Sequence, residues 1–451
     1  MERTTYGLSD LDKGGLTKSV QFVLFYALPA TTDLQKVISS LLAGVENATH
    51  HLPLMAGNLQ FVESGKLAIL SPPGSSIDVK ICRLEDSQSF SALAKDLFSP
   101  NDLDLSPFLP SEASPGKPSP VCLIQLSLIE GGILMGLRVS HAAADWTSLD
   151  TFLTLICQGS QAFHHQKAMP PSPLDLARDL NRAPYNTPAP DPAFSQQDRL
   201  AHLPLFHIME KSQFQFKPPP VTRAGIYRIS EPTIQQLKTQ CSPHLDQVDY
   251  ITSYDCIAAL IWTALTRARL RVRPGQENAV SRFVHPIDVR SRDPEHRTSP
   301  RYFGNAVIGS LAGPVPAHVL ATPGVRGLAA AATQIRQSIH AVDVSTIGHF
   351  TALQASLSDT QMLLPNADFA DMDLFMNTWA TGNAAKYELG SVGRPVAFRV
   401  KVDMPAACAM ILPDLSGDEA RVFDILVQAP MPEYQVLTRD PQFLRYFEPV
   451  V

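Results

Sequence analysis

The segment His141-Ala142-Ala143-Ala144-Asp145 carries the residue types best suited to chemistry in this chain. Imidazole accepts and releases a proton near neutral pH, so a histidine facing a cleft suits general-base activation of a hydroxyl or an amine. The small alanines after it allow a substrate to approach closely. A second interpretation stays open, because HxxxD is a short pattern that also arises by chance: Asp145 N-caps a helix and His141 is a satisfied, half-buried ring.

The elements that position this segment follow from hydrophobic periodicity. The runs Val121–Leu128 and Ile133–His141 flank Glu130-Gly131-Gly132 and predict a β-hairpin. Apolar residues from Trp146 to Ile156 then return at helical spacing, which predicts a helix that ends near residue 164. The segment Ser140–Asp145 therefore lies at a strand-to-helix junction.

Strands and helices are predicted along the rest of the chain as well. Helices are expected over 33–48, 253–269 and 325–342 and around Leu353. A short strand over Gly225–Ile229 is followed by a helix start at Ser230-Glu231-Pro232. Because strands and helices are interleaved throughout, the fold class is α/β, with α+β as the alternative.

The length of 451 residues predicts two packed units of about 200 residues each. Two proline-rich stretches, Met169–Pro192 and Lys217–Pro220, suit neither core strands nor helix interiors. We therefore expect an N-terminal domain over 1–168, a crossover over 169–220 and a C-terminal domain over 221–451.

Composition excludes several classes of protein. Hydrophobic residues make up 45% and charged residues 18% of the chain, which opposes intrinsic disorder. The net charge is −6, from 37 basic and 43 acidic side chains, so nucleic acid is not an expected partner. The apolar stretch Val20–Ala30 is too short to span a bilayer. We expect a cytoplasmic protein without a membrane span.

Cysteines and sequence motifs exclude further kinds of site. The chain has no CxxC pair, and its cysteines lie mostly among apolar neighbours, which predicts buried free thiols. The paired histidines His50-His51 and His164-His165 lack a third ligand, so no metal site is predicted. A Walker loop, a GxGxxG loop and a GxSxG elbow are absent from the sequence.

Several segments, in order, resemble the BAHD family of acyl-CoA-dependent acyltransferases. The resemblance includes LSxLD at Leu8–Asp12, YPLAGRL at Leu52–Leu59, HxxxD at His141–Asp145, a central helix with Ile261-Trp262 and Ala268-Arg269, and TSW at Asn377–Trp379. Asp288–Arg292 and Tyr302–Asn305 are similar to the DxRxR and YFGN elements of fungal members, including those akin to trichothecene 3-O-acetyltransferases.

Three positions depart from the family pattern. Trp146 stands where the family has glycine after the motif aspartate, so it narrows the pocket or turns inward as a core anchor. Glu388–Pro395 replaces the DFGWGxP element. Ser140 stands where condensation domains of peptide synthetases have a histidine, which favours the branch that uses free acyl-CoA.

The resemblance implies a fold of two chloramphenicol-acetyltransferase-like domains with an active-site channel between them. It implies that His141 is the general base and that Asp145 orients and supports the motif. Arg290 or Arg292 is then the expected partner of Asp145, and Glu388 pairs with the other arginine; a solvated charged turn is the alternative for the arginines. Acetyl-CoA or another acyl-CoA is the expected co-substrate, with no tightly bound cofactor, and a monomer is expected.

Two further assignments each have a structural alternative. The Trp379 indole or the Asn377 amide is a candidate donor to the oxyanion, whereas Trp379 is also suited to a core. Arg267 and Arg269 belong to a cationic run that suits coenzyme A phosphates, and a solvated helix end is the alternative.

The resemblance predicts O-acylation of a secondary-metabolite hydroxyl, with acetyl as the first choice of acyl group. Two rival functions remain: a condensation-type enzyme that takes acyl groups from a carrier protein, and a non-catalytic relative that binds an acyl-CoA or a metabolite. The second rival is motivated by the altered element over Glu388–Pro395.

Overall fold

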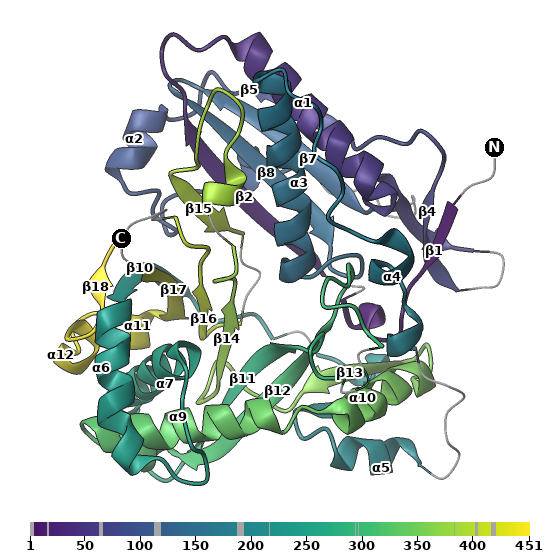
Figure 1. Ribbon diagram of the computed structural model, residues 1–451. Coiled ribbons are helices and arrows are strands. Elements are labelled where there is room, and N and C mark those ends of the chain that lie inside the picture. Colours follow the sequence, from purple (N-terminus) through teal and green to yellow (C-terminus); the bar gives the residue numbers. More distant parts are fainter. Residues whose placement is uncertain are drawn as a thin grey trace. The chain divides into compact units, whose positions relative to one another are not determined.

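The computed structural model divides the chain into two compact units (Figure 1). Unit 1 comprises 1–186, 293–306 and 381–402, and unit 2 comprises 187–292, 307–380 and 403–451. Each unit therefore combines distant segments, whereas the division expected from the proline-rich stretches consists of continuous parts of the chain. The residues that the structure describes are 4–15, 18–62, 66–111, 119–186, 194–215, 217–293, 295, 297–382, 384–401, 405–415 and 421–451.

Unit 1 contains a five-stranded sheet in the order β15-β2-β8-β7-β5. Neighbouring strands are antiparallel except β5 and β7, which are parallel. The strands are β15 (Ala397–Val400), β2 (Ser19–Ala27), β8 (Gly132–Ser140), β7 (Cys122–Ile129) and β5 (Val79–Arg83). The hairpin of β7 and β8 confirms the predicted one, and β8 ends immediately before His141.

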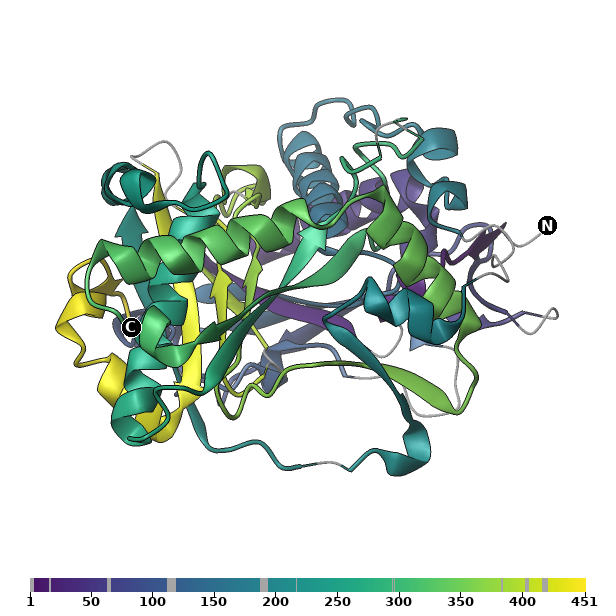
Figure 2. The ribbon, with the colours of Figure 1, turned by 90° about the horizontal axis from the view of Figure 1, so that it is seen from below.

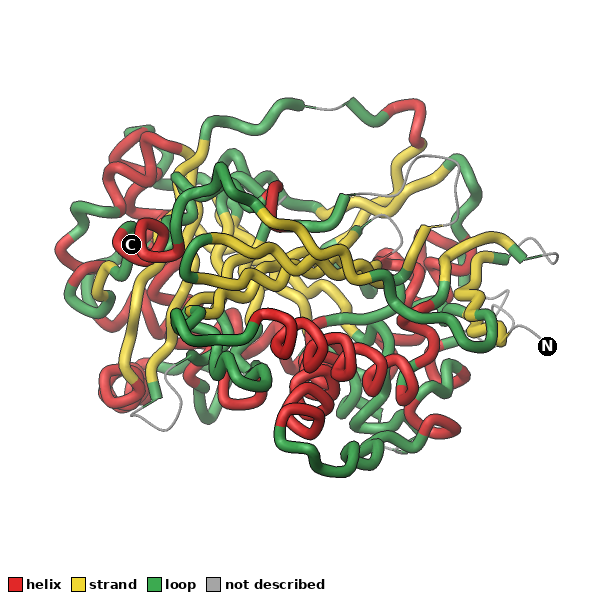
Figure 3. The backbone as a smooth tube through the Cα atoms, turned by 90° about the horizontal axis from the view of Figure 1, so that it is seen from above, coloured by secondary structure: helices red, strands yellow, loops and turns green. Residues whose placement is uncertain are grey.

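Two long helices, α1 (Leu34–His51) and α3 (Trp146–His164), lie together against one side of this sheet (Figures 1 and 3). The side chain of Asp33 caps α1 by accepting from the N–H groups of Gln35 and Lys36. The helices cross closely, because a Cβ at Gly44 would stand 2.2 Å from the Ile156 carbonyl oxygen. Helix α3 ends at the predicted residue, and α1 confirms the helix predicted over 33–48 but continues to His51.

The other elements of unit 1 are short. They include a second sheet in the order β1-β4-β3-β6 (Thr4–Gly7, Leu67–Ser71, Asn58–Phe61, Ser119–Pro120), helices α2 (Phe90–Lys95) and α4 (Leu176–Asp179), and a 3-10 turn over Asp12–Gly15.

Unit 2 contains a seven-stranded sheet in the order β12-β11-β14-β16-β17-β10-β18. The pairs β11–β14 and β14–β16 are parallel, and the others are antiparallel. The strands, in sheet order, are Val307–Pro316, Val280–Asp288, Leu374–Thr378, Cys408–Ile411, Val422–Pro430, Thr222–Ser230 and Glu448–Pro449.

Helices α7 (Ser253–Val272) and α9 (Val325–His340) pack against each other in unit 2, and Figure 2 shows α9 as a long green helix. Trp262 on α7 is fully buried in the core of the unit. The remaining elements are α5 (Gln196–Ala201), α6 (Glu231–Cys241), α8 (Ala317–Leu320), α10 (Val344–Ser356), α11 (Met431–Leu437), α12 (Pro441–Leu444) and the two-stranded sheet of β9 (Phe206–Glu210) and β13 (Gln361–Pro365).

The structure confirms the predicted helices and the strand before α6, which extends three residues further toward the N-terminus than predicted. All six cysteines are free, as predicted; Cys82 is partly exposed and the others are buried. Within the described residues, no helix is both long enough and apolar enough to cross a bilayer.

Candidate active site

His141 directly follows β8, in the junction between the hairpin and α3. Its N–H donates to the Lys18 carbonyl oxygen at 2.9 Å, which continues the pairing of β8 with β2. A Cβ at Gly15 would lie 2.7 Å from the carbonyl carbon and oxygen of His141. The main chain of His141 is therefore fixed from the N-terminal segment of unit 1, and position 15 has no room for a side chain.

The imidazole of His141 is partly buried, and its Nδ1 is shielded from solvent. Burial lowers the pKa of His141 below 6.5, and a hydrogen bond to its own main chain together with the Asp145 charge opposes that shift. The ring is therefore neutral at pH 7, which is the state that accepts a proton.

Asp145 caps α3. One carboxylate oxygen accepts from the N–H of Ser148 at 3.0 Å and the other from the N–H of Ala306 at 2.8 Å. The Asp145 N–H in turn donates to the Gly304 carbonyl oxygen at 3.1 Å. Asp145 is only 2% exposed. It thus joins the helix start to the segment over 302–306, and its role in supporting the motif stays a prediction.

Trp146 turns inward. It is 8% exposed, and its ring forms T-shaped pairs with Phe22 and Phe398 at centroid distances of 5.9 and 5.7 Å. Those two phenylalanines stack on each other at 5.1 Å. Of the two interpretations of this departure, the structure favours the core anchor.

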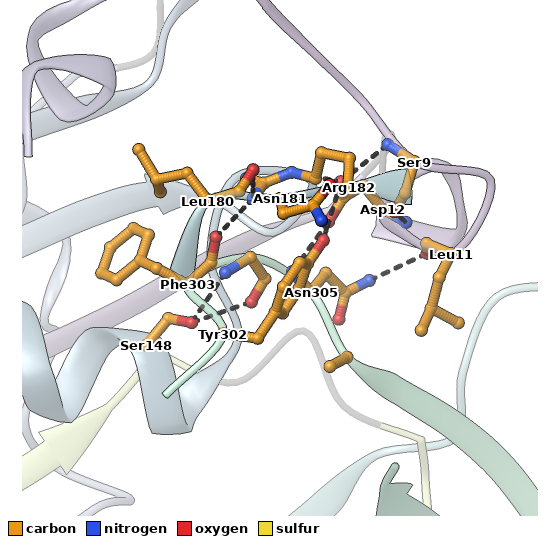
Figure 4. Close-up of polar contacts among 12 residues, drawn as sticks. Ser9, Leu11, Asp12, Ser148, Leu180, Asn181, Arg182, Tyr302, Phe303 and Asn305 are labelled. Atoms are coloured by element: carbon orange, nitrogen blue, oxygen red, sulfur yellow. Dashed lines mark hydrogen bonds and ion pairs between the residues drawn. The ribbon is translucent and has the colours of Figure 1, made fainter. Parts of the chain in front are cut away.

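A second set of polar contacts joins LSxLD to YFGN (Figure 4). Asp12 accepts from the Asn305 N–H at 2.8 Å and lies 3.0 Å from Nε of Arg182. Ser148 Oγ donates to the Gly304 carbonyl oxygen and accepts from the Gly304 N–H. Asp12 and Asn305 lie in these two motifs, whereas Arg182 lies in the proline-rich stretch outside any motif, so the sequence predicts no role for it.

The altered element over 388–393 forms a tight turn in unit 1. Leu389 and Gly393 make an isolated bridge, and Gly393 has a φ of +86°, which favours glycine. Just before it, the Tyr387 carbonyl oxygen accepts from the Tyr26 hydroxyl at 3.0 Å, while the Tyr387 hydroxyl donates to Asp150 on α3. Tyr387 thus anchors the start of the segment that leads to β15.

Glu388 is partly buried beside this turn, and its charge is one cause of the raised pKa of Cys157 on α3. Arg290 and Arg292 belong to unit 2, where Arg290 forms an ion pair with Asp288 at 2.8 Å and Arg292 donates to the Val342 carbonyl oxygen at 3.3 Å. Their pairing with Asp145 and Glu388 stays a prediction.

Asn377 and Trp379 lie at the end of β14 in unit 2. The Asn377 side-chain oxygen accepts from the main-chain N–H of Thr378 at 2.8 Å. The main-chain N–H of Trp379 donates to the Ile411 carbonyl oxygen at 2.8 Å. Trp379 is 5% exposed. Their role toward an oxyanion stays a prediction.

Arg269 does not suit the predicted role in coenzyme A binding. It is 1% exposed, and its guanidinium donates to the carbonyl oxygens of Met372 and Asp373 at 2.7 and 2.8 Å. Arg267 forms an ion pair with Asp440 at 2.8 Å. Arg269 and Arg267 thus connect α7 to main-chain carbonyl groups near Asp373 and to Asp440.

Comparisons with known proteins extend over nearly the whole chain. The profile of the transferase family matches residues 1–443. Acyltransferase cm3D of Cordyceps militaris is 25% identical, over 98% of this chain and 96% of that protein. O-acetyltransferase astG of Aspergillus oryzae is 23% identical, over 92% of this chain and 95% of that protein.

The fold also matches a solved structure. TRI101 of Fusarium sporotrichioides, in complex with coenzyme A and T-2, superimposes with a TM-score of 0.81 at 18% identity, covering 99% of this chain and all of that chain. This likeness confirms the mixed α/β fold with two chloramphenicol-acetyltransferase-like domains. Since the family profile covers residues 1–443, the chain belongs to the transferase family of BAHD-like acyltransferases.

Proposed function

We propose that this acyltransferase takes its acyl group from acyl-CoA, with acetyl as the first choice, and transfers it to a hydroxyl of a hydrophobic secondary metabolite with His141 as general base. The observation that carries the proposal is the partly buried imidazole of His141 at the strand-to-helix junction, where burial lowers its pKa. One relative is named as an O-acetyltransferase, and a protein of similar fold has been solved with coenzyme A bound. Both support acyl transfer from acyl-CoA to a hydroxyl.

The proposed reaction begins with the acceptor hydroxyl hydrogen-bonded to Nε2 of His141, since Nδ1 is shielded. As the hydroxyl oxygen attacks the thioester carbonyl carbon, its proton moves to Nε2. The tetrahedral intermediate then collapses, the carbon–sulfur bond breaks, and the departing thiolate takes the proton from the imidazolium. The ester and free coenzyme A are released, and His141 is neutral again.

The oxyanion of that intermediate needs a hydrogen-bond donor, and we propose the Trp379 indole N–H or the Asn377 amide for this role. One such donor contributes about 10² to 10³ in rate. Trp379→Phe keeps most of the ring volume and removes the donor, so a loss of that size in kcat at unchanged thermal stability supports the assignment of Trp379. Unchanged turnover assigns Trp379 to the core.

The first experiment is calorimetric titration of the protein with acetyl-CoA, with coenzyme A and with an acetyl group on a carrier protein. Binding of acetyl-CoA and coenzyme A supports the proposal and precedes a screen of hydroxyl acceptors. Binding of the carrier-linked donor alone favours the condensation-type enzyme. Binding of acetyl-CoA without turnover across the acceptor screen favours the non-catalytic relative.

The role of His141 is tested with His141→Ala. We expect kcat to fall by about 10² to 10⁴, which is the range for general-base assistance, while the fold is retained. His244→Ala is the matched control, because His244 is exposed at the end of a short 3-10 turn. Near-normal turnover of His141→Ala would reject His141 as the base.

A further inference from the structure

Arg182 makes three contacts with the buried centre of unit 1. Its Nη1 donates to the Phe303 carbonyl oxygen at 2.7 Å, its guanidinium carbon lies 4.9 Å from the Tyr302 ring centroid, and its Nε lies 3.0 Å from Asp12 (Figure 4). The side chain of Arg182 is 10% exposed and that of Asp12 is fully buried. Only a planar, multiply donating cation makes these contacts at once.

Asp12 connects this arginine to two segments of the main chain. One carboxylate oxygen accepts from the Asn305 N–H at 2.8 Å, and the other accepts from the Ser9 N–H at 2.8 Å. The Tyr302 hydroxyl lies 3.4 Å from both oxygens. A carboxylate without a nearby cation would be costly at a fully buried position, so Arg182 stabilises the charged state on which these contacts depend.

The residues next to Asn305 hold the motif aspartate. Gly304 accepts from the Asp145 N–H at 3.1 Å, and Ala306 donates to the Asp145 carboxylate at 2.8 Å. At the other end of the motif, the 3-10 turn of Asp12 continues to Gly15, which packs on the His141 carbonyl group. One turn of the N-terminal segment therefore contacts both ends of HxxxD, directly at His141 and through 304–306 at Asp145.

We propose that Arg182 and Asp12 are positioning residues for His141, and this inference rests on the proposed role of His141 as general base. Arg182 holds Asp12 and the segment over 302–306 in a fixed position relative to each other. This arrangement determines the direction in which the junction presents the His141 imidazole. A misplacement of a catalytic group by about 1 Å costs on the order of 10²-fold in rate.

The test replaces Arg182 by lysine and by glutamine. Arg182→Lys keeps the charge beside Asp12 but lacks the planar fork, so we expect kcat to fall about tenfold while the KM for acetyl-CoA stays within about twofold. Arg182→Gln is expected to lose about 10²-fold in kcat. Arg178→Gln is the matched control, because Arg178 lies on α4 close in sequence with an exposed side chain.

A double-mutant cycle separates positioning from general stability. If Arg182 acts through His141, Arg182→Lys costs little further activity in a His141→Ala background. A full tenfold loss in that background, or a wild-type kcat for both Arg182 variants, would overturn the inference. A near-normal rate for His141→Ala alone instead rejects the proposed base, so the two failures are distinguishable.

Asp12→Asn provides a second test that remains informative if Arg182→Gln fails to fold. Asparagine keeps an acceptor oxygen for the Asn305 N–H but removes the charge that pairs with Arg182. We expect the same split, with kcat reduced about tenfold and KM unchanged. The NMR titration of the His141 ring supplies a readout besides activity: its pKa moves in Asp12→Asn and Arg182→Lys, and an unmoved pKa in both contradicts the proposal.

Discussion

His141 and Asp145 are four residues apart, and their surroundings give them different capacities. Burial keeps the His141 ring neutral at pH 7 and shields one of its nitrogens. Both carboxylate oxygens of Asp145 accept main-chain N–H groups, from α3 and from the segment after Asn305. These surroundings suit the proposed roles, in which the histidine transfers the proton and the aspartate holds the junction.

The proposed role of His141 as general base predicts how the reaction depends on pH, because the pKa of His141 is lowered. A base acts in its neutral form, so activity falls with decreasing pH only where the ring gains a proton. We expect the acid limb of kcat/KM to have its midpoint below 6.5, the ordinary value for histidine. The measurement is kcat/KM against pH with His244→Ala as control. A midpoint above 6.5 would contradict the effect of burial.

Asp145→Asn tests the supporting role. The amide offers one acceptor oxygen and directs an NH₂ group at the second main-chain N–H, which leaves a buried donor unsatisfied at a cost of about 1–3 kcal/mol. Thermal stability and kcat should fall together. Asp33→Asn is the matched control, because Asp33 caps α1 at an exposed position and asparagine caps equally well. Lost activity at full stability would assign Asp145 a direct chemical role.

At the scale of elements, local pattern predicts the hairpin and α3, because periodicity and a capping residue determine them within a few turns of chain. It does not predict the partners of the junction. Gly15 and Arg182 lie in short segments without hydrophobic periodicity, and their importance depends on what packs against them. A signal was nevertheless present for Asp12 and Asn305, since both lie in the motifs that carry the resemblance.

Gly15→Ala tests how tightly the N-terminal turn fixes the junction. The added Cβ would stand 2.7 Å from the His141 carbonyl group and 2.9 Å from the Ala142 nitrogen, and all of these atoms belong to the main chain. Since neither side yields easily, we expect a loss of about 1–3 kcal/mol in stability and at least tenfold in kcat. Gly7→Ala is the control, because a Cβ there meets no atom within 4 Å. Equal behaviour of the two variants would contradict the close contact.

At the scale of the whole molecule, length predicts two units but not their composition. The segments over 293–306 and 381–402 belong to unit 1, although each lies between segments of unit 2 in the sequence. The position of the segment over 381–402 depends on long-range contacts, such as the pairing of β15 with β2 and the hydrogen bond from the Tyr26 hydroxyl to the Tyr387 carbonyl oxygen. Local periodicity carries no information about such contacts, so a division by proline-rich stretches yields continuous halves.

Acid sensitivity of the whole molecule follows from His285 on β11, which is fully buried in unit 2. Nδ1 lies 3.0 Å from the Tyr254 hydroxyl and Nε2 lies 2.9 Å from Ser338 Oγ. Burial, with the Arg336 charge, lowers the pKa of His285 to about 3. Below pH 6.5 the unfolded chain therefore binds a proton that the folded chain does not, and stability falls with decreasing pH until about pH 3.

One such group changes the free energy of unfolding by about 1.4 kcal/mol per pH unit. His141, His164 and His349 also have lowered pKa values, so they add to the slope in the same direction. We expect urea unfolding across this pH range to give His285→Gln a lower free energy of unfolding than the wild type. The slope of that free energy against pH should be smaller by the contribution of about one proton, because glutamine keeps polar contacts without titrating. His244→Gln, at an exposed position, should keep the wild-type slope. A wild-type slope in His285→Gln would mean that His285 does not take up a proton on unfolding, and that the acid sensitivity of the molecule lies in the other three histidines and the carboxylates.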